Sequence, residues 1–162
     1  MGRYLLALVC FLAVGLSSVQ AAVTPYCCPH YWTLRGNRCY RFIGKAMDWH
    51  SAQGHCKGLD HKANLVSLNT AGEEDFILHM WAEKGSRYDR LWVGFNDLDW
   101  EGHYKWVGIN KPLDYTNWLR EQPNNYGHSQ DCGAIHTISG YWNDETCTRK
   151  YAFICERPRP GA

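Results

Sequence analysis

The amino-acid sequence predicts an α+β domain in which two helices pack beside small, mainly antiparallel sheets. Two segments in the first half of the chain carry apolar residues at three- and four-residue spacing, the period of an amphipathic helix. The second half instead contains short apolar segments between long polar loops, which is typical of strands. Helices followed by strands, rather than alternating with them, indicate the α+β class.

The first expected elements are a hairpin and a helix. Gly36-Asn37 is a turn signal between short strand-like segments, so residues 28–39 should form a hairpin. Residues 47–59 should form a helix, because their apolar residues recur on one face. These residues are Trp49, Ala52, Cys56 and Leu59.

The second helix should begin at Asn69-Thr70. Thr70 and Glu73 have the spacing of a capping box, in which two side chains satisfy backbone N–H groups at the start of a helix. Its expected apolar face consists of Phe76, Ile77, Met80 and Trp81. Short strands are expected at 64–68, 91–95, 104–108, 132–136 and 151–155.

Residues 109–131 form a long polar connection. Loops of this length are uncommon in compact domains unless they serve a function. The stretch QPNNYGHSQDC at 122–132 is rich in amide, hydroxyl and carboxylate oxygens. Such oxygens suit a hard cation or a polyhydroxylated ligand, so this loop is the candidate binding site.

The first 21 residues are expected to be a signal peptide. A basic start at Arg3 precedes an apolar run at 4–15 and small residues before a cleavage site. The run is too short for a membrane span, and no later segment is apolar enough to insert into a bilayer. The mature protein is therefore expected outside the cell, with residues 22–27 as a short extension and residues 157–162 as a flexible tail.

The charge balance and the motifs exclude two classes of function. The chain has 17 Lys and Arg against 16 Asp and Glu, and loss of Arg3 would balance them. A balanced chain without a basic run gives no reason to expect a nucleic-acid partner. There is no G-x-S-x-G motif, and the histidines show no metal-ligand spacing, so no enzymatic activity is expected.

Cysteine usage supports export, because disulfides persist in oxidising compartments. The chain has eight cysteines, of which Cys10 would leave with the signal peptide. The other seven predict three bridges and one thiol left over. Their spacing alone does not fix the pairing.

An ordered set of short motifs resembles the C-type lectin-like domain in its long form, over residues 28–156. The motifs are CP at 28–29, CY at 39–40, WVGFND at 92–97, YTNW at 115–118, QPN at 122–124, DC at 131–132, WND at 142–144 and FICE at 153–156. The resemblance implies the bridges Cys28–Cys39, Cys56–Cys155 and Cys132–Cys147. It leaves Cys27 unpaired and available for a disulfide-linked homodimer.

The resemblance also implies a calcium-assisted sugar site. The implied calcium ligands are Gln122, Asn124, Gln130, Asn143 and Asp144, with Pro123 in the cis form. The implied sugar contacts are Gln122, Asn124, Tyr126, Asn143 and Asp144. An auxiliary calcium position corresponds to Asp97, Glu101, Asn125 and Gln130.

Two amides depart from the family pattern. Sugar-binding members usually have a glutamate where Gln130 stands, and mannose-type members have another where Gln122 stands. Asp144 is then the only anionic ligand of the first calcium, so weak binding is expected, and complete loss of calcium dependence stays an alternative. Gln122-Pro123-Asn124 matches neither the mannose-type nor the galactose-type triplet, and Tyr126 favours galactose-type sugars without excluding mannose.

The expected function is recognition of terminal sugars, including those on microbial surfaces, as in innate immunity or agglutination. The alternative is a domain of the same fold whose sugar site has decayed and which binds a protein, a mineral or an ice surface.

Overall fold

The computed structural model describes residues 27–84 and 89–161. The predicted signal peptide at 1–21 and residues 22–26 of the predicted extension lie outside these ranges. Among the helices within them, none is long and apolar enough to cross a bilayer.

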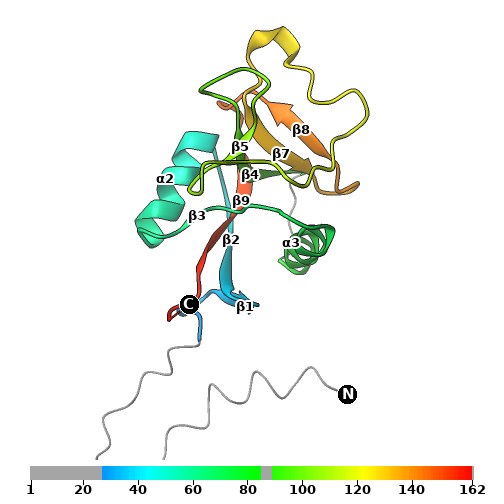
Figure 1. Ribbon diagram of the computed structural model, residues 1–162. Coiled ribbons are helices and arrows are strands. Elements are labelled where there is room, and N and C mark those ends of the chain that lie inside the picture. Colours follow the sequence, from blue (N-terminus) through cyan, green and yellow to red (C-terminus); the bar gives the residue numbers. More distant parts are fainter. Residues whose placement is uncertain (1–26, 85–88, 162) are drawn as a thin grey trace, which may run out of the picture.

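A three-stranded ladder joins the two ends of the domain (Figure 1). Strand β1 (Thr33–Arg35) pairs antiparallel with β2 (Arg38–Met47), which confirms the expected hairpin around Gly36. Strand β2 in turn pairs antiparallel with β9 (Tyr151–Pro158), the last strand of the chain. The short β3 (Asn64–Leu65) adds to β9 from the other side.

Strand β9 runs further than the sequence suggested. The flexible tail was expected from residue 157, but Arg157 and Pro158 still pair with Cys39 and Arg38 of β2. The Arg157 guanidinium also contacts the Asp60 carboxylate, which ties the strand end to the segment after the first helix. These partners are remote in sequence, so the prediction at residue 157 was wrong for lack of any local signal.

Both predicted helices are confirmed. Helix α2 (Trp49–Leu59) begins at Asp48, whose side chain accepts a hydrogen bond from Ser51 N at 2.9 Å. Helix α3 (Ala71–Glu83) begins at Thr70, whose side chain accepts from Glu73 N. Capping of this kind satisfies N–H groups that a helix start leaves unpaired.

The second half of the domain forms the upper part of Figure 1. Its strands are β4 (Arg90–Asn96), β5 (Lys105–Trp106), β6 (Lys111–Pro112), β7 (Cys132–His136) and β8 (Trp142–Glu145). Strand β4 pairs antiparallel with β5 and β7, and parallel with β9. Strand β8 pairs with β7, which places the WND motif beside the end of the long loop.

The core between these elements is rich in aromatic rings. Trp92, Trp106, Trp142 and Phe95 are fully buried. Phe95 also packs against Gly133 of β7, where an added Cβ would lie 2.4 Å from the ring, so only glycine permits this close approach. The rings of Phe95 and Trp118 lie 5.0 Å apart, which fastens the long loop to the core.

Three disulfides staple the domain, and they are the three implied by the resemblance. They join Cys28 to Cys39, Cys56 to Cys155 and Cys132 to Cys147. Cys27 is itself disulfide-bonded, so the prediction of an unpaired thiol there was wrong. The disulfide-linked homodimer stays a prediction.

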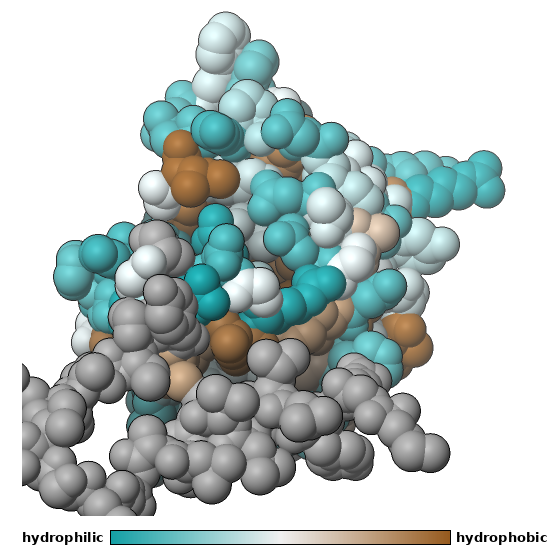
Figure 2. Space-filling model, turned by 60° about the horizontal axis from the view of Figure 1, so that its bottom comes forward, coloured by the Kyte–Doolittle hydropathy of each residue, from teal (hydrophilic) through white to brown (hydrophobic). Residues whose placement is uncertain are grey.

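The lower face of the molecule shows apolar residues only in separate patches. Figure 2 brings this face forward, and its hydrophobic atoms stand among hydrophilic ones, apart from the area under the grey atoms. Mixed surfaces of this kind are normal for a globular domain.

Candidate ligand-binding site in the long loop

Buried Glu74 of helix α3 anchors the long loop. Its carboxylate accepts hydrogen bonds from Tyr115 Oη at 2.6 Å, from Asn117 Nδ2 at 3.1 Å and from Trp142 Nε1 at 2.7 Å. The backbone adds bonds between Leu119 N and Trp142 O and between Trp142 N and Asn117 O. The loop is therefore held in one shape, although it contains little regular structure.

Asp144 lies at the centre of the candidate site. It belongs to β8 and is fully buried. Its carboxylate accepts from Asn124 N at 3.1 Å and from Asn125 N at 2.6 Å. The Tyr104 hydroxyl approaches the same oxygen at 3.4 Å. Asp144 thus draws the backbone of residues 124–125 toward the WND motif.

Two side-chain amides converge on one backbone N–H of the loop. Gln130 Oε1 accepts from Tyr126 N at 2.7 Å, and Asn124 Oδ1 accepts from the same N–H at 3.0 Å. The loop tightens here into the short 3-10 helix η1 (Tyr126–His128). The Tyr126 side chain projects outward and is 79% exposed, so one aromatic face stands free beside the amides.

The other two predicted ligands flank this cluster. Asn143 Nδ2 donates to Asp144 O at 2.8 Å and to Glu145 Oε1 at 3.1 Å, which uses its donor side and leaves the Oδ1 atom without a described hydrogen bond. Gln122 precedes Pro123 through a cis peptide bond, as expected. Its Oε1 atom is buried and has no hydrogen-bond partner.

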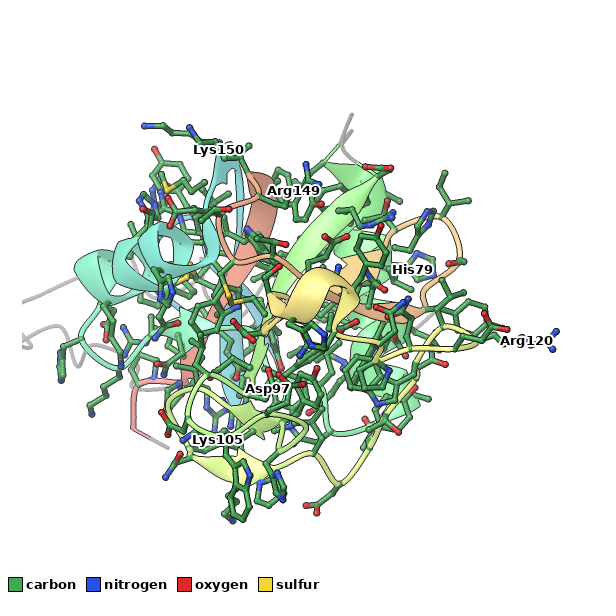
Figure 3. All side chains as sticks on the ribbon, turned by 90° about the horizontal axis from the view of Figure 1, so that it is seen from above. His79, Asp97, Lys105, Arg120, Arg149 and Lys150 are labelled. Carbon is green, nitrogen blue, oxygen red and sulfur yellow. A yellow bond between two sulfur atoms is a disulfide. The ribbon has the colours of Figure 1, made fainter. Side chains whose placement is uncertain are left out.

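A second group of acidic side chains lies next to the first. Asp97 is 2% exposed; one of its oxygens accepts from Gly102 N at 2.7 Å, and the other, Oδ1, has no donor. Glu101 contacts Asn125 Nδ2, which links the 97–102 turn to the long loop. Figure 3 shows Asp97 below the η1 turn.

Desolvation and nearby carboxylates raise the pKa values of Asp97 and Glu101. Burial, followed by the nearby Asp131 charge, raises the pKa of Asp97. The pKa of Glu101 is also raised, by desolvation and then by Asp97, Asp131 and Asp144. Like charges held together disfavour ionisation unless a cation joins them.

The structure brings most of the predicted site residues together and adds others. Asn124, Asn125, Gln130 and Asp144 share hydrogen bonds, and Asn143 adjoins Asp144. No described hydrogen bond joins Gln122 to the other four predicted ligands. Sequence reasoning missed Glu74 and Tyr104, whose partners are remote. A carboxylate on the apolar side of a helix was the available signal for Glu74.

In the described part of the chain, charged side chains alone do not form a metal site. Within residues 27–84 and 89–161, no group of three or more His, Cys, Asp or Glu side chains is placed to hold a metal ion. Amide and backbone oxygens would have to complete the shell of any cation bound by this loop.

Comparison with known proteins places the chain in a family. The family model for the lectin C-type domain matches residues 45–157. Echinoidin of Heliocidaris crassispina is 33% identical over 145 residues, which are 82% of this chain and 97% of echinoidin. The galactose-specific lectin nattectin of Thalassophryne nattereri is 31% identical over 152 residues, which are 94% and 92% of the two chains.

Solved structures of the same fold superimpose on this chain. The C-type lectin CEL-I from Cucumaria echinata superimposes with a TM-score of 0.76 at 28% identity, over 82% of this chain and 98% of CEL-I. A calcium-independent type II antifreeze protein also superimposes, with a TM-score of 0.70 at 26% identity over 82% and 95% of the two chains. The chain belongs to the C-type lectin domain family.

Proposed function

We propose that this protein is a secreted lectin that binds terminal sugars, without catalysis, at a calcium-assisted site. The site consists of Gln122, Asn124, Gln130, Asn143 and Asp144. The observation that carries the proposal is the convergence of two distant segments, because Asn124 N and Asn125 N both donate to Asp144, which lies 20 and 19 residues away.

The donor set fits calcium. All five side chains offer oxygen, which is the ligand that calcium takes in proteins. The buried Gln122 Oε1 has no donor, so a cation would satisfy an otherwise unpaired oxygen. When bound, calcium would supply coordination positions for two vicinal sugar hydroxyls. The amides of Gln122, Asn124 and Asn143 would orient those hydroxyls by hydrogen bonds.

The auxiliary group of Asp97, Glu101 and Asn125 is proposed to hold a second calcium. Asp97 Oδ1 is buried without a donor, and the raised carboxyl pKa values mark a place where negative charge lacks compensation. This group also adds negative charge beside the first calcium. Even so, a primary site with Asp144 as its only carboxylate should bind calcium weakly.

Galactose-type sugars are the favoured ligands, with mannose-type sugars as the second choice. Tyr126 presents an exposed ring beside the site, and the apolar face of a galactose ring can stack on such a surface. A relative named as a galactose-specific lectin covers almost the whole chain. Glycans on microbial surfaces are the proposed partners outside the cell.

One observation favours the alternative of a decayed sugar site. A calcium-independent antifreeze protein shares this fold and 26% of the aligned sequence, so the fold can work without calcium. In that case the loop would bind a protein, a mineral or an ice surface.

A glycan array with calcium, repeated with a chelator, tests both hypotheses, the calcium-assisted lectin and the decayed sugar site. Binding of galactose-terminated glycans in calcium alone is the expected result. The Asp144→Asn variant should lose this binding, whereas Asp75→Asn, on the exposed side of α3, should keep it. Absence of glycan binding in both buffers would reject the lectin and favour the alternative. Binding that survives the chelator would reject only the role of calcium.

A further inference from the structure

A hollow of about 500 Å³ lies beside the candidate site. It is bounded by the 97–103 turn, by the β5–β6 hairpin and by the segment at 113–118. Its lining includes His103, Tyr104, Asn110, Leu113, Thr116 and Trp118. This volume falls in the range of pockets that take small ligands.

The hollow shares a wall with the candidate site. The Tyr104 ring lines the hollow, while its hydroxyl lies 3.4 Å from Asp144 Oδ2 in the site. The 97–103 turn is shared in the same way, because Asp97 and Glu101 belong to the acidic group and Gly102 and His103 line the hollow. On this wall the hollow and the candidate site are therefore separated by one side chain, that of Tyr104.

Ring packing and backbone hydrogen bonds hold the walls of the hollow in place. The rings of Tyr104 and Trp118 pack at 5.1 Å, and Trp118 is fixed in turn by Phe95. His103 stacks on Trp100 with ring centres 4.0 Å apart and an interplanar angle of 18°. Backbone bonds from Trp100 N to Asp97 O and from His103 N to Trp100 O close the turn. Walls that are already formed before binding reduce the entropic cost of binding, because fewer side chains have to be ordered.

The chemistry of the lining suits a sugar ring better than a charged or a purely apolar ligand. The aromatic faces can contact the C–H groups of a hexose. Asn110 and Thr116 are exposed at the rim and can hydrogen-bond to hydroxyls. The Lys105 ammonium is already paired with Asp99, so the rim carries no free charge on that side that would select an anion.

We propose that this hollow binds a second sugar residue of the same glycan whose terminal residue occupies the calcium-assisted site. The proposal rests on the lectin function proposed above and makes the ligand an oligosaccharide rather than a single sugar. Contacts with the second ring should strengthen binding by about 3- to 10-fold over the monosaccharide.

Filling the hollow tests this proposal. Thr116→Trp adds bulk at an exposed rim position that makes no described side-chain hydrogen bond to the site. Thr148→Trp is the matched control, since Thr148 is also exposed and adjoins Arg149, which Figure 3 shows at the opposite edge from Lys105. Dissociation constants are measured in calcium for methyl galactoside and for a panel of galactose-terminated disaccharides with different linkages.

The expected result separates the two ligands. The natural chain and Thr148→Trp should bind at least one disaccharide about 3- to 10-fold more tightly than methyl galactoside. Thr116→Trp should bind methyl galactoside with unchanged affinity, but it should bind the disaccharide no more tightly than methyl galactoside. In methyl-labelled protein, signals of Leu113 and Thr116 should shift with the disaccharide and not with the monosaccharide.

Two outcomes would overturn the inference about the hollow and leave the proposed function intact. One is tighter binding of the disaccharide that persists in Thr116→Trp. The other is binding of methyl galactoside to the natural chain with no tighter binding of any disaccharide. Absence of methyl galactoside binding to the natural chain would instead reject the galactose function on which the inference rests.

Discussion

At position 130, an amide occupies the place where a carboxylate would add a full negative charge to the site. Gln130 Oε1 accepts the Tyr126 N–H at 2.7 Å, and a glutamate of the same length can accept the same bond. Gln130→Glu should therefore keep the loop structure and tighten calcium binding about tenfold, because affinity follows the charge of the ligands. Titration calorimetry with calcium measures the change.

The control for this prediction adds the same charge elsewhere. Thr148→Glu lies on the exposed turn after β8 and should leave calcium affinity nearly unchanged. If Gln130→Glu and the natural chain bound calcium equally well, Gln130 would not be a ligand.

Tyr126 should select the sugar without stabilising the fold. Its side chain is 79% exposed, so Tyr126→Ala should alter the free energy of unfolding by less than about 0.5 kcal/mol. Loss of the aromatic face should weaken galactose binding about 3- to 10-fold and leave mannose binding unchanged. Tyr126→Phe keeps the face and should behave as the natural chain.

Tyr31 provides a matched control for exposure. It is 74% exposed and lies just before the β1–β2 hairpin, at the other end of the molecule. Tyr31→Ala should leave both sugar affinities unchanged. Equal galactose binding by Tyr126→Ala and the natural chain would contradict the stacking role.

At the scale of elements, the sequence predicted the helices better than the strands. Helix α2 was expected at 47–59 and occupies Trp49–Leu59, because its apolar period and its cap are local features. Strand β8, at Trp142–Glu145, was not predicted. Its residues WNDE are mostly polar, and they form a strand because β7 pairs with them. The strand expected at 104–108 is limited to Lys105–Trp106 (β5), because only these two residues pair with β4.

The site was predictable only in its motif residues. QPN and WND are contiguous in the sequence, so the resemblance identified them. Glu74 meets Tyr115 and Trp142 across 41 and 68 residues, and Tyr104 meets Asp144 across 40. No period or spacing reports such pairs, because they arise only when helix α3, the long loop and β8 pack together.

Glu156 connects two strands with the segment between β3 and α3 and should make stability depend on pH. It lies on β9, and its Oε1 accepts from Ser67 N at 3.1 Å and contacts Arg38 of β2 at 3.2 Å. Burial raises the pKa of its carboxyl above the ordinary value of 4.5, against the opposite influence of Arg38 and Ser67. The folded state thus favours the protonated form, so its contribution to stability is lost as pH rises through the raised pKa.

Glu156→Gln removes this titration and keeps a side-chain oxygen for Ser67. The free energy of unfolding of the variant, relative to the natural chain, should therefore increase from about pH 4 to about pH 7. Urea unfolding at several pH values measures the difference. Glu83→Gln, on the exposed end of α3, should show a flat difference. A flat difference for Glu156→Gln as well would show that the raised pKa has no effect on stability.

At the scale of the whole molecule, the disulfides divide the chain into loops of very different length. Cys56–Cys155 spans 99 residues, whereas Cys132–Cys147 spans 15 and Cys28–Cys39 spans 11. The long bridge joins α2 to the last strand, which also pairs with β2, and the chain between its two cysteines contains α3 and the strands β3 to β8. The candidate binding loop at 109–131 lies inside this closure.

The long bridge should therefore contribute most to stability. If bridges act mainly by restricting the unfolded chain, replacing both Cys56 and Cys155 with alanine should lower the free energy of unfolding by about 4.7 kcal/mol, against about 3 kcal/mol for the Cys132 and Cys147 pair. Both pairs are buried, so the cavities left behind are comparable and the ranking reflects loop length. Urea unfolding of the two double variants measures it. Equal losses would mean that contacts in the folded state, rather than chain closure, determine what each bridge contributes.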